Sequence, residues 1–433
     1  MRRLFTNISH YYFLCAVFFI ALIIWLPDSG YDKYFWVSWA NYISQHGLSE
    51  AYNNPEINYH PIILFIIKGF TLFVHSPNQT NINWLKVPTA VFDWGIIFIT
   101  LNLLKEHKKN LQWGLLLVFN PAFWYNTIIW GQFDSVWVFF VLLAFYLADK
   151  KYFFYSVAAF VLALNTKLFA LFFLPFLVLM WIRLKPDANV WGVRWIRAET
   201  PFYTFPKSVS LLFSTIVLQI VVLLPFLYTT HYSLSSIIQR STEYYNSLSR
   251  NAYNIWYYLI NDPVNTADTN YLIPSVIFVG EVFLALLYFI FIKPSPFRGR
   301  VWEGVALASL VFFLFLTRMH ERYAHAALVF SFIAFGLTPQ PPLPKRGGAK
   351  KVLPLSGEGF RMGAYFFLFS LAYFLNLEAV MQTANKSLGL NVDYTNILFN
   401  PKMVATLYFI ACLIISYPIL ILPLRGRNKK SLP

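Results

Sequence analysis

The chain has 433 residues, of which 58% are hydrophobic and only 12% are charged, and its mean hydropathy is +0.53. Because a soluble domain carries about 25% charged residues, this composition excludes a string of soluble domains and predicts a polytopic membrane protein. The formal net charge of +15 does not indicate nucleic-acid binding, since the basic residues recur in short clusters between apolar runs. Cys15 and Cys412 both lie within apolar runs, which excludes a disulfide framework.

Apolar runs predict the membrane spans, since a helix needs about 20 apolar residues to cross a bilayer. The expected fold is all-α, with about twelve transmembrane helices in a single integral-membrane domain over 1–433. The first run lacks a small-residue cleavage site, so we expect a retained helix rather than a cleaved signal. The predicted spans are 11–27, 84–104, 111–130, 134–149, 152–166, 168–184, 208–228, 271–292, 302–317, 324–337, 363–380 and 403–424.

The distribution of Lys and Arg predicts the orientation. If both termini are cytoplasmic, the inner segments hold 24 of the 34 Lys and Arg residues, as the positive-inside rule requires. The predicted inner loop 338–362 is a low-complexity string rich in Pro, Gly and basic residues, and loops 183–207 and 293–304 are similar. Such strings cannot build a packed core, and we assign them no function.

The first outer loop, 28–83, is much longer than its neighbours. From Lys33 to Gln45 apolar and aromatic residues recur at helical spacing, which predicts an amphipathic helix lying on the membrane surface. Asp28 and Asp32 precede this helix, where Asp is a favoured capping residue. Spacing alone therefore favours capping over catalysis for Asp32.

A polar break interrupts the apolar sequence at Trp130-Gly-Gln-Phe-Asp-Ser-Val-Trp, at the predicted outer end of a span. Asp134 has apolar sequence on both sides, and ionisable residues at such depth are costly and usually paired or functional. Lys167 lies at the next predicted outer turn. Two alternatives stay open: an Asp134–Lys167 ion pair, or a lysine that binds an anionic ligand.

A third polar segment, Arg318-Met-His-Glu-Arg-Tyr, lies between two apolar runs at the predicted outer boundary. Arg offers bidentate geometry for phosphate, and His adds a donor. The alternative is an internal Arg–Glu bridge that ties helices together. Because one arginine exceeds what Glu321 alone can neutralise, the charge count favours an anion site.

No pattern in the sequence indicates a metal or a nucleotide. Zinc-type Cys/His spacing, P-loops, Gly-x-Ser-x-Gly and Rossmann fingerprints are absent from the sequence, so neither ATP nor a nucleotide sugar is the expected substrate. Asp93 and Glu378 lie within predicted spans, where buried polar contacts are expected rather than catalysis.

Three motifs in this order resemble the GT-C superfamily of integral-membrane glycosyltransferases. They are Gly30-Tyr-Asp-Lys-Tyr-Phe-Trp-Val-Ser-Trp-Ala with the later Tyr59-His-Pro, then Trp130-Gly-Gln-Phe-Asp-Ser, then Met319-His-Glu-Arg-Tyr. The chain looks most like bacterial relatives of the second mannosyltransferase of GPI-anchor assembly, over roughly residues 25–335. It departs from the pattern at His60, where the family usually has a second proline; that could alter the re-entrant turn but removes no catalytic group.

The resemblance implies inverting transfer of a hexose, with mannose favoured, from a polyprenyl-phosphate sugar to a lipid-linked or cell-envelope glycan acceptor. The expected location is the outer face of the bacterial inner membrane. On this mapping Asp32 is the catalytic base. The residues expected to bind the donor phosphate are His320, Arg322, Arg318 and Lys167. The residues expected around the acceptor, or in positioning roles, are Asp134, Asp28, Glu321 and Tyr59. No metal, cofactor or nucleic acid is expected. The lipid-phosphate sugar is a substrate, and the other expected partners are membrane lipids.

Two other classes of protein share this composition. A multi-pass lipid or glycan transporter, or flippase, would also be positive-inside, but it should show Gly/Pro-broken helices in matched halves and charges at the midplane. Here the charged motifs gather at one predicted face. A non-catalytic assembly subunit would not require Asp32 and a phosphate-type cluster on the same side. For an enzyme, Asp32, Asp134, Lys167 and His320 are expected to line one outward cavity.

Overall fold

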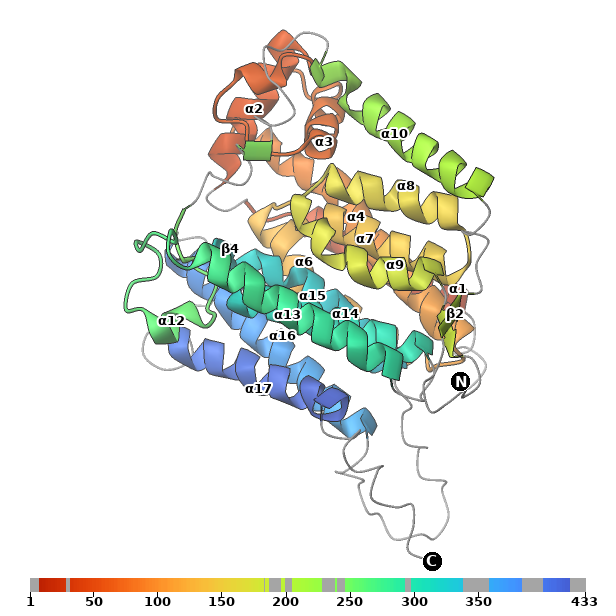
Figure 1. Cartoon of the computed structure of the whole chain (residues 1–433). Helices are drawn as coiled ribbons and strands as arrows, with labels where there is room; N and C mark the ends of the chain where they lie inside the picture. The colour runs from red at the N-terminus through yellow and green to blue at the C-terminus, as the bar shows by residue number, and fades with distance from the viewer. Residues whose placement is uncertain are drawn as a thin grey trace, which may run out of the picture. The chain divides into compact units, whose positions relative to one another are not determined.

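A computed structural model describes residues 8–28, 32–182, 184–186, 196–198, 205–227, 238–239, 246–292, 297–337, 358–383 and 400–420. Helices dominate these residues, as the composition predicts (Figure 1). Within the described residues the strands form two short pairs. β1 (Leu184–Pro186) is antiparallel to β2 (Ile196–Ala198), and β3 (Ser249–Arg250) is parallel to β4 (Met319–His320).

The helices that the structure describes follow in chain order. They are α1 (Ile8–Trp25), α2 (Lys33–His46), η2 (Ala51–Asn53), α3 (Pro61–Thr71), η3 (Asn81–Leu85), α4 (Lys86–Glu106), α5 (Gln112–Val118), α6 (Pro121–Trp124), η4 (Tyr125–Trp130), α7 (Asp134–Asp149), α8 (Phe153–Leu164), η5 (Leu168–Phe173), α9 (Leu174–Ile182), α10 (Phe205–Leu227), α12 (Trp256–Leu259), α13 (Leu272–Ile292), α14 (Phe297–Phe315), η7 (Glu321–Ala324), α15 (His325–Leu337), α16 (Glu358–Thr383) and α17 (Pro401–Leu420).

Within the described part of the chain, three helices are long and apolar enough to cross a membrane: Ile8–Trp25, Asn81–Glu106 and Arg361–Met381. Several other apolar helices are shorter, with 10–17 residues. The chain is therefore all-α and carries membrane-length helices, whereas the count of twelve spans and their orientation stay predictions. The inner loop 338–362 lies almost wholly outside the described residues.

One predicted span, 111–130, is divided in the structure into α5, α6 and the π-helix η4. The break has a local cause. Pro121 lacks a backbone N–H and cannot continue α5, but it fits the first position of a new helix. Asn120 caps that helix, since its side chain accepts a hydrogen bond of 3.0 Å from the N–H of Ala122.

The described chain divides into two compact units, each assembled from segments distant in the sequence. Unit 1 combines Met1–Val17, Thr100–Asn126 and Tyr245–Pro433, and unit 2 combines Phe18–Ile99 and Thr127–Tyr244. A single functional domain over 1–433 stays a prediction.

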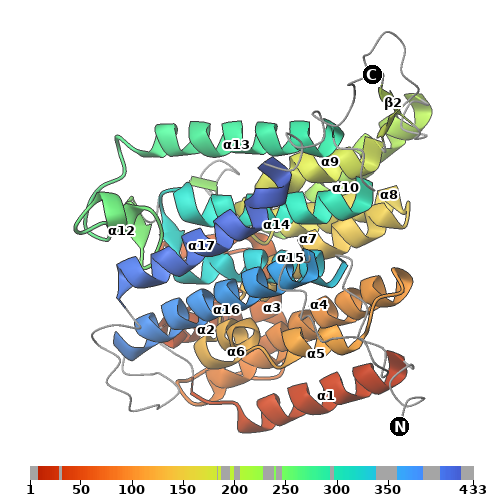
Figure 2. The ribbon, with the colours of Figure 1, turned by 90° about the horizontal axis from the view of Figure 1, so that it is seen from below.

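Unit 1 is a series of helices in which neighbours in sequence pack against each other. α13 packs on α14, α14 on α15, α15 on α16, and α16 on α17. Figure 2 shows the teal α14 and the blue α16 and α17 running alongside one another. The short pair β3–β4 precedes α15, and it brings residues near 250 beside the third polar motif.

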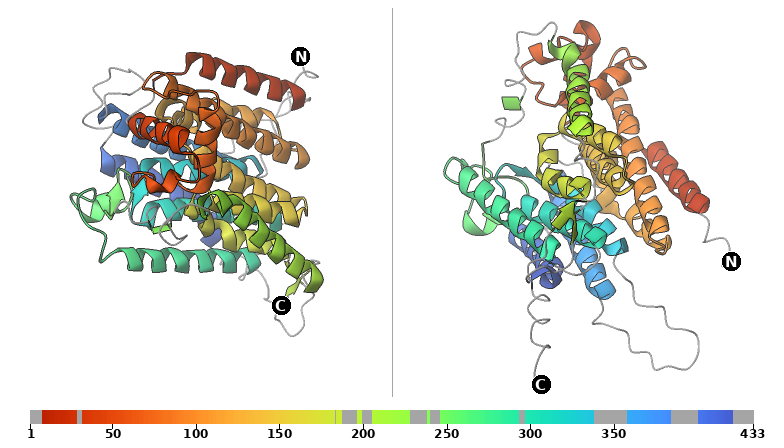
Figure 3. Two further views of the ribbon diagram at one scale, coloured as in Figure 1. Left: turned by 90° about the horizontal axis from the view of Figure 1, so that it is seen from above. Right: turned by 45° about the vertical axis from the view of Figure 1, so that its right-hand side comes forward.

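Unit 2 holds the helical hairpin α7–α8, with α9 packed against α7. α10 packs on both α8 and α3, and Figure 3 shows this yellow-green helix beside the red and orange helices of the first outer loop. That loop is folded, because α2 and α3 bury apolar faces against each other.

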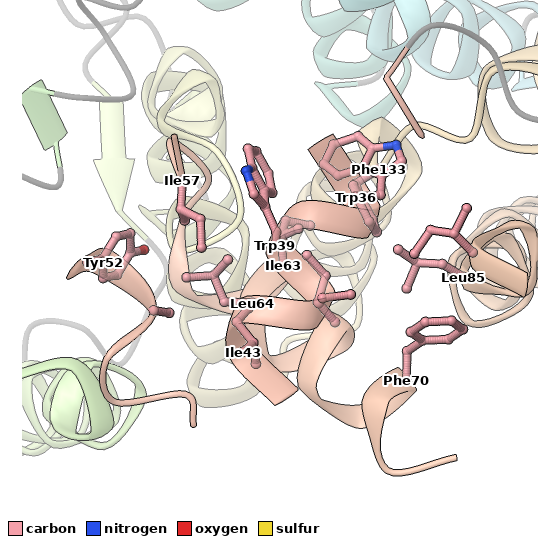
Figure 4. Packing of buried hydrophobic residues seen from close by; sticks show 14 of the residues in the cluster. Trp36, Trp39, Ile43, Tyr52, Ile57, Ile63, Leu64, Phe70, Leu85 and Phe133 are labelled. Carbon is pink, nitrogen blue, oxygen red and sulfur yellow. The ribbon is translucent and has the colours of Figure 1, made fainter. Parts of the chain in front are cut away.

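The helix of the first outer loop, α2, packs into a core of apolar side chains. α2 buries Trp36, Trp39 and Ile43 over the residues for which the sequence predicts an amphipathic helix. Figure 4 shows these side chains packed with those from α3, such as Leu64. Gly47 ends the helix at φ +86°, a conformation that glycine adopts without steric cost. The location of α2 at a membrane surface stays a prediction.

Candidate functional site

The first motif places a half-buried carboxylate, Asp32, directly before α2. Its side chain makes no hydrogen bond to the N-terminus of that helix, so the capping interpretation is wrong. Oδ2 instead accepts a hydrogen bond of 3.2 Å from Trp130 Nε1 and another from Gln132 Nε2. Both donors belong to the second motif, about a hundred residues further along the chain. Both of these bonds go to Oδ2, and neither goes to Oδ1.

A break between two helices places Trp130 and Gln132 beside the carboxylate of Asp32. The π-helix η4 ends at Trp130, and α7 begins at Asp134. Gly131 lies between them at φ +84°, where a side chain would be strained. Short π-helical segments often mark functional positions. The turn lets Trp130 and Gln132, two residues apart, reach the same oxygen of Asp32.

A buried lysine, Lys86, stabilises the end of η4 at this break. The sequence alone did not indicate this role. Lys86 Nζ donates to the carbonyl oxygen of Ile128 within η4 at 2.7 Å and to that of Pro27 at 2.6 Å. The last carbonyls of a helix lack partners within the helix, so an ammonium group there satisfies them. The available signal was a lysine at the edge of an apolar run, which reads equally well as a solvated residue.

Tyr59 connects the first outer loop to the second motif. Its hydroxyl donates to Gln132 Oε1 at 3.2 Å. Its ring packs edge-on against Trp36 and Trp39, with ring centroids 5.4 Å apart in both cases. Tyr59, Gln132 and Asp32 therefore form a continuous chain of hydrogen bonds.

The second motif also contains the ion pair that was one of the two alternatives for Asp134. Lys167 Nζ lies 2.5 Å from Asp134 Oδ1, and Trp137 Nε1 donates to the same oxygen at 3.1 Å. The two side chains of the pair are only 18% and 3% exposed, respectively. The structure thus pairs Lys167 with a carboxylate, and its role toward a donor phosphate stays a prediction.

His60 lies beside this pair and is buried. Burial, together with the nearby charge of Lys167, lowers the pKa of His60 to about 4, so the imidazole is neutral at pH 7. The segment is tied to the neighbouring turn, because the N–H of Ile62 donates to the carbonyl of Asn165 at 3.1 Å.

Asp28 makes contacts within the loop itself. It forms an ion pair of 2.7 Å with Lys33 and accepts a hydrogen bond of 3.0 Å from Asn83. Its side chain is 49% exposed, so the pair contributes little to stability.

In unit 1, the arginine that begins the third motif has a carboxylate partner that sequence reasoning missed. Arg318 Nε lies 2.6 Å from Asp268 Oδ2, and its Nη2 donates to Oδ1 at 3.2 Å. The Thr317 hydroxyl donates to the same carboxylate at 3.0 Å. The premise that one arginine of the motif exceeds the available negative charge is therefore wrong. No local pattern links these residues, which lie 50 positions apart.

The remaining charged residues of the motif are buried. Arg322 Nη1 lies 3.6 Å from Glu321 Oε1, and His320 Nδ1 lies 3.9 Å from Glu321 Oε2. Both distances exceed a hydrogen bond. The parallel pair β3–β4 places Arg250 in register with His320. Burial and then the charge of Glu321 raise the pKa of Tyr253 to about 12, so this hydroxyl stays a proton donor.

Two acids within predicted spans make the buried polar contacts expected of them. In unit 2, Asp93 accepts a hydrogen bond of 2.5 Å from Ser135, whose hydroxyl also contacts Thr127 at 2.7 Å. In unit 1, Tyr125 donates to Glu378. Among the described residues, no cluster of three or more His, Cys, Asp or Glu side chains could hold a metal ion.

The sequence-predicted residues fall into two groups. Asp28, Asp32, Tyr59, Asp134 and Lys167 lie in unit 2. Arg318, His320, Glu321 and Arg322 lie in unit 1, so a common cavity stays a prediction. The chain matches no protein-family model and no curated protein. The resemblance to GT-C glycosyltransferases therefore depends on the three motifs alone.

Proposed function

We propose that this chain is an integral-membrane glycosyltransferase acting at the outer face of the bacterial inner membrane. It transfers a hexose, with mannose favoured, from a polyprenyl-phosphate sugar to a hydroxyl of a lipid-linked or cell-envelope glycan. The observation that carries the proposal is the carboxylate of Asp32, which is half-buried and held by Trp130 and Gln132. Two of the motifs that resemble the family thus meet at the residue proposed as the base.

In the proposed reaction, Oδ1 of Asp32 takes the proton of the acceptor hydroxyl. The acceptor oxygen attacks the anomeric carbon as the bond from that carbon to the phosphate oxygen breaks, which inverts the configuration. The electron pair leaves with polyprenyl phosphate, whose charge grows from about −1 to −2 as the diester becomes a monoester. General-base assistance of this kind is worth roughly 10²–10⁴ in rate.

Cations near the leaving phosphate would offset its growing charge. Among the arginines of the third motif, Arg322 suits this role better than Arg318. Arg318 is already held by two close contacts with Asp268, of 2.6 and 3.2 Å. His320 and Lys167 remain proposed helpers.

The test is transfer of radiolabel from polyprenyl-phosphate mannose, or from polyprenyl-phosphate glucose, to a lipid extract by membranes that contain the protein. Asp32→Asn keeps the size of the side chain and an acceptor oxygen but removes its basicity. We expect it to lower kcat by about 10²–10⁴ at normal expression. The matched control is Glu56→Gln, which makes the same change at an exposed carboxylate of the same loop.

An Asp32→Asn variant that retains more than a tenth of the wild-type rate would exclude Asp32 as the base. A wild-type protein that transfers neither sugar, yet speeds the movement of labelled lipid between leaflets, would favour the transporter instead.

A further inference from the structure

We infer that Gln132, held by Tyr59, is a positioning residue that fixes the Asp32 carboxylate through Oδ2 and so directs Oδ1 to the acceptor hydroxyl. The inference rests on the proposed function, because it assigns a role within the same site. It starts from the continuous chain of hydrogen bonds from Tyr59 to Gln132 and on to Asp32.

The orientation of the Gln132 amide follows from its two neighbours. A glutamine amide has one oxygen end, which accepts, and one nitrogen end, which donates. The hydroxyl of Tyr59 donates to the oxygen end at 3.2 Å, and this leaves the nitrogen end facing Asp32. A flipped amide would put its oxygen against the carboxylate oxygen, which is repulsive while Asp32 is ionised.

Tyr59 is itself held in place, so it can act as the reference for the amide. Its ring lies 5.4 Å from the rings of both Trp36 and Trp39, and 6.0 Å from that of Phe133. Trp36 and Trp39 are 4% and 2% exposed and belong to the core of the first outer loop. Aromatic packing on several sides leaves the phenol little freedom to move.

The consequence is a carboxylate that is fixed in place through one of its oxygens. Trp130 and Gln132 are neutral donors, so they hold the Asp32 side chain without forming an ion pair with it. Both donate to Oδ2, and the proton of the acceptor therefore goes to Oδ1. An ammonium group in the place of Gln132 would neutralise the base instead, as Lys167 does at Asp134.

The experiment measures kcat, donor KM and the kcat–pH profile of two variants. Tyr59→Phe removes the hydrogen bond that anchors the amide oxygen of Gln132, and we expect about a tenfold fall in kcat with donor KM unchanged. The acid limb of the profile should move to higher pH, because the ionised form loses a donor. Gln132→Glu puts a second carboxylate beside the first, so its acid limb should move further, with about a hundredfold fall in kcat at neutral pH.

The matched control is Tyr52→Phe, which removes a hydroxyl from the same core. That hydroxyl donates to the backbone carbonyl of Tyr59 at 2.8 Å and not to Gln132. A purely structural role for Tyr59 predicts that both Tyr→Phe variants lose stability and leave the pH profile in place. Our inference predicts that only Tyr59→Phe moves the acid limb.

If Gln132→Glu does not fold, Trp130→Phe takes its place, since it removes the other donor to Oδ2, and a smaller shift in the same direction is expected. Profiles of Tyr59→Phe and either second variant that overlay the wild type, while Asp32→Asn is inactive, would overturn the inference alone. An active Asp32→Asn variant would overturn the proposed function together with it.

Discussion

Asp32 and Asp134 occupy neighbouring motifs, and each accepts a hydrogen bond from a tryptophan indole. They differ in the second partner. Asp32 is half-buried and receives an amide, whereas Asp134 is 3% exposed and lies 2.5 Å from the ammonium group of Lys167. A carboxylate whose donors are neutral is hydrogen-bonded without being part of an ion pair. A carboxylate against a cation is neutralised and serves the packing of its helices.

The same difference recurs within the third motif of unit 1. Arg318 is held by two contacts to Asp268, and Arg322 approaches Glu321 only to 3.6 Å. The two contacts with Asp268 indicate a structural role for Arg318. Membership of a motif therefore does not by itself distinguish a residue that binds a ligand from one that stabilises the fold.

The difference between Asp32 and Asp134 is tested most directly by removing the charge of each carboxylate in turn. Asp134→Asn should lower the free energy of unfolding by about 3 kcal/mol, because it leaves Lys167 largely buried beside a neutral partner. Asp32→Asn should cost about 1 kcal/mol or less, since the amide oxygen still accepts a hydrogen bond. Thermal unfolding in detergent measures both losses.

The double variant Asp134→Asn/Lys167→Met is the control, and it should recover part of the loss because no unpaired charge remains. Equal losses for Asp32→Asn and Asp134→Asn would remove the distinction between the two sites.

The pH dependence of stability tests the surroundings of His60, which lies beside the Asp134–Lys167 pair. In the folded protein this imidazole stays neutral down to about pH 4, whereas in the unfolded chain it takes up a proton below about 6.5. The unfolded state therefore binds more protons in this window, so the stability falls as the pH drops from about 6.5 to 4 and then levels off. The total loss is at most about 3 kcal/mol.

His60→Gln should remove most of this slope in denaturant unfolding measured from pH 7 to pH 4. His46→Gln, at an exposed histidine of the same loop, should leave the slope in place. An unchanged slope in His60→Gln would show that another group carries the acid sensitivity.

A smaller effect is expected in unit 1. Asp268→Asn should cost about 2 kcal/mol, because it weakens two charge-assisted hydrogen bonds from Arg318. Arg322→Lys should change stability little but raise the donor KM, since lysine keeps the charge and loses the fork. Thermal unfolding and donor KM, measured on both variants, separate the two roles. A donor KM that rises in Asp268→Asn and not in Arg322→Lys would reverse the assignment.

Local pattern was enough to predict several features of the chain. The lengths of the apolar runs predicted an all-α chain, and the spacing of Trp36, Trp39 and Ile43 predicted a helix over the residues that form α2. Even so, the span predicted over 111–130 is divided, because Asn120 and Pro121 end one helix and begin another. That signal was present in the sequence but weaker than the apolar run around it.

The three motifs could be found from the sequence, and so could the residue types able to do chemistry in them. Their partners could not. Spacing alone favoured a capping role for Asp32, yet its donors come from positions 98 and 100 residues away, and Asp268 reaches Arg318 across 50 residues. Hydropathy and helical periodicity are properties of neighbouring residues, so the sequence by itself determined the class of fold and the placement of polar breaks. Which charge is neutralised and which is kept depends on side chains that packing brings together, and only the tertiary structure decided it.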